Sequence, residues 1–286
     1  MILRLLRTML LLFAASINST PSTAKALPDT LNVDVPEKAR QQGQFFTVRV
    51  ADTSSKPGLW FMERSYAMFL QPDSSWRALV PIENLTRPGS YAILVRTDSL
   101  EQKIPVLVKP NNRKIQYITL DSSKQGIKAT ETEKTRVKAA LQTESPEKLY
   151  TGSFLRPSPG RTSSLFGLKR SYDGRPVESY HKGIDISAPR GTPVKSTANG
   201  RIILTGTVTA GFRLHGNTVI IDHGQGLTSI YMHLDAITVK EGQSVVKGEV
   251  IGRVGHTGIS TAPHLHWGTY LYGTSVDPLL FEGKTY

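Results

Sequence analysis

The 286-residue sequence contains no cysteine, and this absence excludes several kinds of chemistry. No disulfide can stabilise the fold, no thiolate can attack a substrate or bind a metal, and no cysteine can carry a lipid anchor. Any metal site in this chain must therefore use histidine, aspartate or glutamate ligands.

Long apolar runs are also lacking, since no stretch supplies the roughly 20 apolar residues of a membrane span. The N-terminus instead combines a basic head, the short apolar run 9–15 and the tripeptide Ala24-Lys25-Ala26. This pattern predicts a cleavable secretory signal over residues 1–26. We therefore expect a periplasmic or extracellular protein with no stable membrane anchor.

Positive charge exceeds negative charge in the sequence. The formal net charge is +12, and loss of Arg4, Arg7 and Lys25 with the signal would leave +9. This excess favours an anionic polymer as partner, and for an exported protein we expect the cell wall rather than nucleic acid. A basic surface that only aids solubility explains the charge equally well.

Residues 27–120 have a β pattern and contain no histidine. About six or seven β-prone runs, such as 45–50, 76–80, 91–95 and 104–108, are separated by Pro, Gly and Asp turns. This spacing predicts an immunoglobulin-like β-sandwich as an accessory domain. We expect a structural or positioning module. If it gates or orients the catalytic region, a chain starting near Leu149 should cleave soluble substrates at least as fast; the alternative is that the domain only aids folding.

The composition changes to Lys, Glu, Thr and Ala over residues 121–150. Thr130 and Glu133 have the spacing of a capping box, which predicts a short connecting helix that ends near Pro146. Residues 151–286 return to β-prone runs with Gly turns, at 200–204, 217–222, 227–234, 244–254 and 264–271. The overall prediction is a mostly β protein with an N-terminal sandwich, a helical linker and a C-terminal β-sheet domain.

All seven histidines lie between His181 and His266. In an extended segment, His264 and His266 project from one face while Leu265 points to the other side. His181 and Asp185 can also converge on one face. Two histidines and one aspartate leave the fourth position of a tetrahedral zinc open, which is the catalytic pattern.

The order of several motifs over roughly residues 165–281 resembles the lysostaphin-type (LytM-like) zinc endopeptidases. The motifs are 181–185, 216–224, 231–234, the hairpin 239–255 and 257–266. One departure is Ala262, where that family usually has glycine. The resemblance implies an antiparallel, duplicated-hybrid-motif-like peptidase domain in which His181, Asp185 and His266 hold one zinc ion. It also implies that His264 and His233 are the catalytic pair.

By this resemblance, the protein is a zinc metalloendopeptidase that hydrolyses the peptide cross-links of peptidoglycan as a monomer. Zinc would lower the pKa of a bound water toward about 7, a neutral His264 would act as general base, and zinc and a protonated His233 would stabilise the oxyanion. An exchange of these two roles stays open. With no recognisable C-terminal wall-targeting module, we expect D-alanyl to diaminopimelyl bonds to be cut rather than glycine bridges.

Two alternatives compete with this prediction. A catalytically inactive relative that activates other wall hydrolases would lack zinc ligands, whereas this chain retains all three. The second alternative is a biotinyl or lipoyl carrier domain, because residues 239–252 resemble one hairpin of that fold. Such a carrier needs no HxH pair, so the histidines argue against it. We predict structural roles for His223, His215 and His256, and a turn-fixing role for Asn217.

Overall fold

The computed structural model describes residues 30–53, 55–177 and 179–286, so the predicted signal segment lies outside the described residues. These residues form a mostly β protein with one α-helix, α1 (Glu131–Leu141), as the sequence predicts. Among them, no helix is long and apolar enough to cross a membrane.

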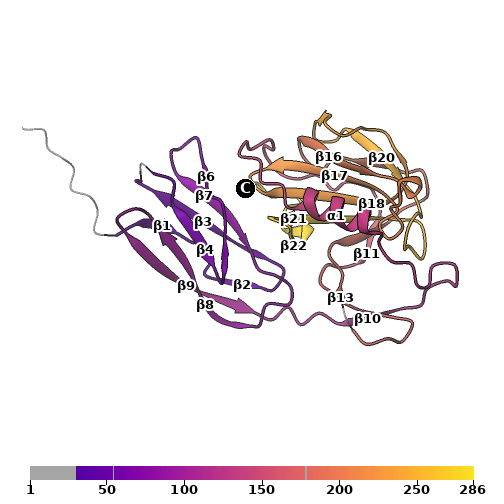
Figure 1. Ribbon diagram of the computed structural model, residues 1–286, viewed down its shortest axis with the longest axis horizontal. Coiled ribbons are helices and arrows are strands. Elements are labelled where there is room, and N and C mark those ends of the chain that lie inside the picture. Colours follow the sequence, from indigo (N-terminus) through magenta and orange to yellow (C-terminus); the bar gives the residue numbers. More distant parts are fainter. Residues whose placement is uncertain (1–29, 54, 178) are drawn as a thin grey trace, which may run out of the picture.

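Two sheets form the N-terminal region, at the left of Figure 1. The four-stranded sheet has the order β1 (Asn32–Asp34), β3 (Phe45–Ala51), β7 (Trp76–Pro81) and β6 (Phe69–Leu70). The five-stranded sheet has the order β2 (Ala39–Gln41), β9 (Glu101–Lys109), β8 (Gly89–Arg96), β4 (Gly58–Phe61) and β5 (Arg64–Ser65). The longer strands match the predicted runs. The additional strands have two to four residues, too few for a clear alternating pattern.

Alternation of buried and exposed residues explains how these sheets form a core. Along β9, Ile104, Val106 and Val108 are buried while the residues between them are exposed. The period of two is that of a strand with one face in the core. These side chains belong to the same hydrophobic cluster as Phe46 and Val48 of β3, so the two sheets share one interior.

A ten-stranded sheet with antiparallel pairing dominates the C-terminal region, at the right of Figure 1. Its main path runs through β11 (Arg161–Ser164), β14 (Ile184–Ser187), β21 (His264–Leu271), β18 (Leu227–Ile237), β17 (Asn217–Gly224), β16 (Gly200–Gly206) and β19 (Ser244–Val245). Off this path lie β15 (Pro193–Lys195), β20 (Val250–Val254) and β22 (Thr274–Val276). The bounds of β21 coincide with the predicted run. Two short 3-10 helices, η1 (Val208–Ala210) and η2 (Pro278–Leu280), lie in connections.

A third sheet joins the end of the N-terminal segment to the C-terminal region. Strand β10 (Ile115–Ile118) pairs in parallel with β12 (Lys169–Tyr172), which pairs with β13 (Ser179–Tyr180). The chain therefore leaves the N-terminal sheets before residue 120 and continues along the edge of the C-terminal region (Figure 1).

Helix α1 packs on the C-terminal sheet rather than standing free between two domains. Thr130 and Glu133 form the predicted capping box at its start. Its buried residues Val137, Ala140 and Leu141 contact a cluster that includes Leu204, Phe212, Ile220, Ile230 and Tyr270. The apolar side of the helix thus completes the interior of the C-terminal region.

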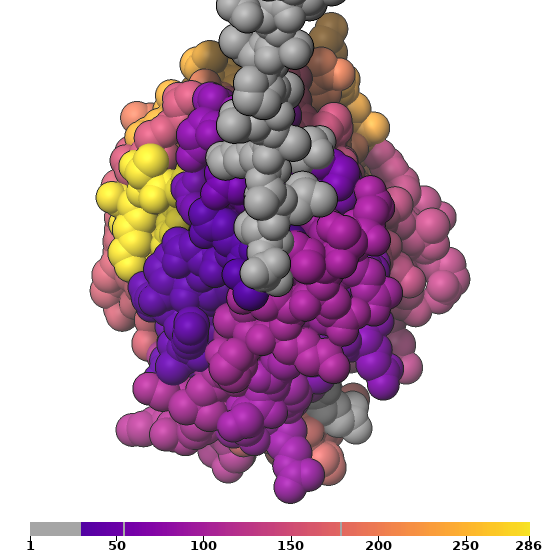
Figure 2. Space-filling view, turned by 90° about the vertical axis from the view of Figure 1, so that its left-hand side faces the viewer, coloured from indigo at the N-terminus to yellow at the C-terminus, as the bar shows by residue number. Residues whose placement is uncertain are grey.

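The N-terminal sheets pack tightly against the C-terminal region, and the two share one hydrophobic cluster. Phe45 of β3 stacks on Phe281, with ring centroids 5.2 Å apart. The buried Arg77 of β7 donates hydrogen bonds to the Tyr150 hydroxyl (3.1 Å) and to Gln225 Oε1 (2.8 Å). In Figure 2, the N-terminal sheets cover much of the face turned to the viewer, and the last residues of the chain, in yellow, lie at their edge.

Candidate metal centre

The three predicted ligands lie together because two neighbouring strands bring them into register. Asp185 of β14 is directly opposite His266 of β21, and His181 lies four residues before Asp185. Gly183 between them is required by close packing, since a β-carbon there would lie 2.6 Å from His266 Nε2. Because Gly183 has no β-carbon, His266 Nε2 can lie close to it while His266 Nδ1 faces Asp185.

Three ligand atoms converge at this point. His181 Nε2, His266 Nδ1 and Asp185 Oδ1 are each 2.9 Å from the other two. His181 Nδ1 donates to the Leu165 carbonyl at 2.9 Å, which leaves the lone pair of Nε2 directed at the group. Such a cluster of acceptors fits a cation with ligands about 2.0–2.2 Å from its centre. These residues are the group suited to hold a metal ion among the described residues.

Burial sets the charge of the ligands. It lowers the pKa of His181, and it lowers the pKa of His266 to about 3, so both imidazoles are neutral at neutral pH. Asp185 lies 2.9 Å from both rings and supplies the carboxylate of the group. Arg170 Nη2 also donates to Asp185 Oδ2 at 3.2 Å. Two neutral imidazoles and one carboxylate are a donor set that suits zinc.

A second pair of histidines lies beside the three ligands. The rings of His233 and His264 are 4.9 Å apart between centroids, and those of His233 and His266 are 6.2 Å apart. His264 Nε2 is 3.7 Å from Asp185 Oδ1. The structure therefore brings all five predicted site residues together.

Carbonyl groups fix the orientation of this second pair. His233 Nδ1 donates to the Thr257 carbonyl at 2.9 Å, and His264 Nδ1 donates to the Ala262 carbonyl at 2.7 Å. Each ring is thus left with Nε2 as its free nitrogen. Burial and the neighbouring His264 and His266 lower the pKa of His233 well below its usual range. Neutral His233 therefore dominates before a substrate binds.

Ala262, the departure from the family pattern, fits its position. It lies outside the left-handed backbone region, so its β-carbon causes no strain there. Its carbonyl still accepts the hydrogen bond that orients His264.

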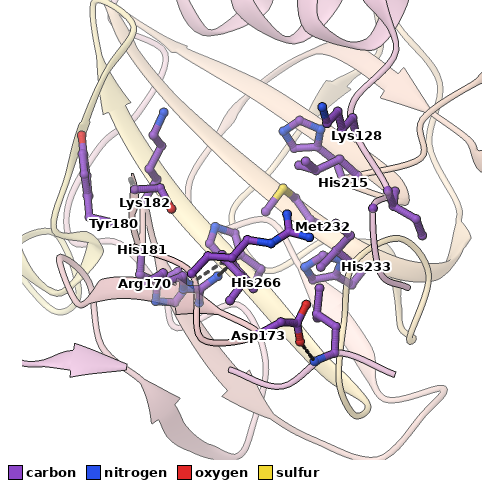
Figure 3. Close-up of a pocket in the computed structure, with 18 of the residues that line it drawn as sticks. Lys128, Arg170, Asp173, Tyr180, His181, Lys182, His215, Met232, His233 and His266 are labelled. Carbon is purple, nitrogen blue, oxygen red and sulfur yellow. Dashed lines mark hydrogen bonds between the residues drawn. The ribbon is translucent and has the colours of Figure 1, made fainter. Parts of the chain in front are cut away.

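A pocket of about 530 Å³ opens over the site, lined in part by His181, His233 and His266 (Figure 3). Among the described residues, four Lys and Arg side chains and the carboxylate of Asp173 line its walls; the basic residues are Lys128, Arg170, Arg175 and Lys182. In sequence order, Leu120 is the first of the described residues that line the pocket. Part of the segment 120–128, rather than the N-terminal sheets, therefore walls the pocket.

Of the histidines predicted to be structural, His223 is buried between two partners. Its Nδ1 donates to the Asn199 carbonyl, and its Nε2 lies 2.7 Å from Ser229 Oγ. His256 contacts Ser260 Oγ at 2.9 Å. His215 differs from the prediction in that it lines the pocket. No local pattern indicated this, because the loop around His215 has no periodicity and its partner, Glu133, is distant in the chain.

Asn217 holds a turn beside the site, as predicted. Its Oδ1 accepts from the backbone N–H of Val208, and its Nδ2 donates to the Asp235 carbonyl. The basic lining residues were not predicted, since isolated Lys and Arg in loops resemble ordinary surface residues.

The comparisons with known proteins agree with this geometry. A model of peptidase family M23 matches residues 179–278. The DD-carboxypeptidase/endopeptidase Mpg of Neisseria meningitidis serogroup B is 46% identical over 119 residues, which cover 42% of this chain and 26% of the relative. The peptidoglycan DD-endopeptidase ShyA of Vibrio cholerae is 37% identical over 125 residues, which cover 43% of this chain and 27% of the relative. The match thus spans about a quarter of the length of these curated relatives.

A solved structure extends the similarity to most of the chain. The crystal structure of a candidate M23 peptidase from Pseudomonas aeruginosa is 30% identical, with a TM-score of 0.65. The similarity covers 86% of this chain and 95% of that one. The N-terminal sheets are therefore part of a shared architecture, and the chain belongs to peptidase family M23.

Proposed function

We propose that this chain is a secreted zinc metalloendopeptidase that hydrolyses the peptide cross-links of bacterial peptidoglycan. The observation that carries the proposal is the convergence of His181 Nε2, His266 Nδ1 and Asp185 Oδ1, 2.9 Å apart, beside a second histidine pair. Three protein ligands with an open side are the arrangement of catalytic rather than structural zinc.

His181, Asp185 and His266 would hold one zinc ion per chain. When bound, zinc supplies a Lewis acid and lowers the pKa of water to about 7. His264 would take a proton from water as general base, a role supported by its Nε2 lying 3.7 Å from Asp185 Oδ1. His233 would donate a hydrogen bond to the developing oxyanion once negative charge there favours its protonation.

The pocket also supports an anionic peptide as substrate. Among the described residues, four basic side chains and one acid line it, and the stems of peptidoglycan carry free carboxylates. Relatives named as peptidoglycan DD-endopeptidases support cleavage of the D-alanyl to diaminopimelyl bond. Such a substrate places the protein in the cell envelope, where we expect it to act as a monomer.

The test uses purified sacculi. The zinc-loaded protein should release muropeptides with a new D-alanyl carboxyl end and a new diaminopimelyl amine, both identified by mass spectrometry. Elemental analysis should give one zinc per chain. Failure to bind zinc after reconstitution would refute the metal centre, whereas a zinc-loaded protein that leaves sacculi intact but activates another wall hydrolase would refute the enzymatic function.

A further inference from the structure

Glu133 lies in the first turn of α1, where the sequence predicts only a capping role. Its side chain is fully buried, and its Oε2 accepts the Thr130 N–H at 3.2 Å, as the capping box requires. The same carboxylate also reaches across to a turn of the C-terminal region. It accepts the backbone N–H groups of Arg213, Leu214 and His215, at 3.0, 3.1 and 2.8 Å.

The turn held by Glu133 supports His233. The His215 carbonyl accepts the backbone N–H of His233 at 3.1 Å. His233 has a φ of 64°, in the left-handed region that non-glycine residues rarely occupy without support from their surroundings. A continuous chain of hydrogen bonds therefore connects Glu133 to the backbone of a predicted catalytic histidine.

The side chain of His215 is held by the same carboxylate. His215 Nδ1 donates to Glu133 Oε1 at 2.6 Å, which leaves Nε2 as its free ring nitrogen. His215 lines the pocket, and Figure 3 shows it near Lys128 at one side, with Met232 between it and His266. The buried carboxylate thus fixes the ring of a histidine that a substrate in this pocket can meet.

Ionised Glu133 is well matched to this role. Burial alone would raise its pKa, but hydrogen bonds from His215 and Leu214 outweigh it and lower the pKa to about 2. Backbone N–H groups stabilise a carboxylate more than its protonated form. The carboxylate is therefore a fixed anchor over the working range of a wall enzyme.

We infer that Glu133 is a positioning residue of the active site: it holds the turn 213–215, which orients His215 toward the pocket and supports the backbone of His233. The effect on turnover rests on the proposed function, whereas the effect on the two histidines does not. The helix α1 then belongs to the catalytic unit and is more than a connection.

The test compares Glu133→Gln with two controls on the zinc-loaded full chain. The substitution keeps the size of the side chain but leaves only one acceptor oxygen, so half of the hydrogen bonds lose their partner. We expect one zinc per chain, a 10- to 100-fold lower kcat, and shifted NMR signals of the His215 and His233 imidazoles. The signals of His223, which is buried elsewhere, should not move.

The controls separate positioning from capping and from charge. Glu131→Gln removes a carboxylate in the same helical turn whose side chain is 87% exposed, and should change neither kcat nor the imidazole signals. Thr130→Ala removes the side-chain half of the capping box and the hydrogen bond from Thr130 Oγ1 to the Gly211 carbonyl (3.0 Å), but leaves Glu133 on the turn. If Thr130→Ala reproduces the effect of Glu133→Gln, Glu133 acts by capping α1 and the inference is wrong.

A double variant tests whether Glu133 acts through His215. Because the two side chains form one unit, Glu133→Gln with His215→Gln should lower kcat little more than the stronger single change. The inference would be overturned if the effects of the two single substitutions on kcat multiplied in the double variant. It would also be overturned if the imidazole signals of Glu133→Gln were unchanged. If Glu133→Gln does not fold, His215→Gln alone must keep zinc, lower kcat and shift the His233 signal. A wild-type protein without hydrolytic activity would refute the proposed function but leave the NMR test decisive.

Discussion

The N-terminal and C-terminal regions are built from the same kind of structure but use buried polar groups differently. In the N-terminal region, the buried Arg77 donates from Nη2 to acceptors on Tyr150 and Gln225 across the interface, while its Nε has no hydrogen-bond partner among the described residues. In the C-terminal region, His181, Asp185 and His266 direct acceptor atoms at one another. A buried polar group is thus structural when donor meets acceptor, and becomes a site when acceptors converge without a donor.

Removal of Asp185 should give the largest effect, because it destroys this convergence. In Asp185→Ala we expect zinc binding and hydrolysis to be lost together, beyond the roughly 10- to 100-fold effect of changing an outer partner of a metal site. Elemental analysis and muropeptide release measure the two losses. Asp98→Ala, at an exposed position of the N-terminal region, should keep both. An Asp185→Ala protein with full zinc content would contradict the ligand assignment.

The next effect separates the two histidines of β21. His264→Ala should keep zinc but lower kcat roughly 10²- to 10⁴-fold, as expected for a general base, whereas His266→Ala should lose zinc. Zinc stoichiometry and turnover of both variants are compared under the same conditions. The opposite pattern would mean that the roles of the two residues are exchanged.

A change at the interface tests the other side of the comparison. Phe281 is fully buried against Phe45, so Phe281→Ala should lower the free energy of unfolding by roughly 3–5 kcal/mol. Zinc stoichiometry should stay at one per folded chain, since the metal centre contains no interface residue. Leu85→Ala, at a side chain that is 64% exposed, should change the stability by less than about 0.5 kcal/mol. If Phe281→Ala lost zinc without losing stability, the metal centre would depend on the interface, and this prediction would be wrong.

The smallest expected effect is the pH dependence of the stability that Glu133 contributes. The pKa of Glu133 is lowered from 4.5 to about 2 in the folded protein, so its ionised form stabilises the fold above about pH 4.5. This contribution is lost as the pH falls from 4.5 toward 2. At pH 7, Glu133→Gln should cost roughly 1.5–3 kcal/mol, as for hydrogen bonds to a charged group. Denaturant unfolding of both proteins should give a difference that shrinks below pH 4.5, and a constant difference would contradict the pKa assignment.

The structure also changes our expectation for a chain that starts near Leu149. Such a chain lacks α1, and with it the side chains of Val137 and Leu141 that cover Phe212 and Ile220. It also lacks Glu133. We now expect it to be less stable than the full chain and less active than the sequence suggested. Equal turnover of the two chains on soluble muropeptides would show that neither α1 nor Glu133 matters for the site.

Short-range patterns in the sequence were enough to predict much of this protein. The β-prone run 264–271 predicted β21 with its bounds, and the period of two of a strand placed His264 and His266 on one face. The spacing of Thr130 and Glu133 predicted the capping box of α1. These features depend on residues close in the chain, whose relative positions are set by the strand and helix periods.

Only the tertiary structure decided which distant groups meet. The pairing of β14 with β21 brings Asp185 to His266, 81 residues away, and the packing of α1 brings Glu133 to His215, 82 residues away. The family resemblance predicted the contact between Asp185 and His266 but not the contact between Glu133 and His215. Local spacing fixes the direction of a side chain relative to its own helix or strand, whereas its long-range partner depends on how whole elements pack, and no single segment of the sequence contains that information.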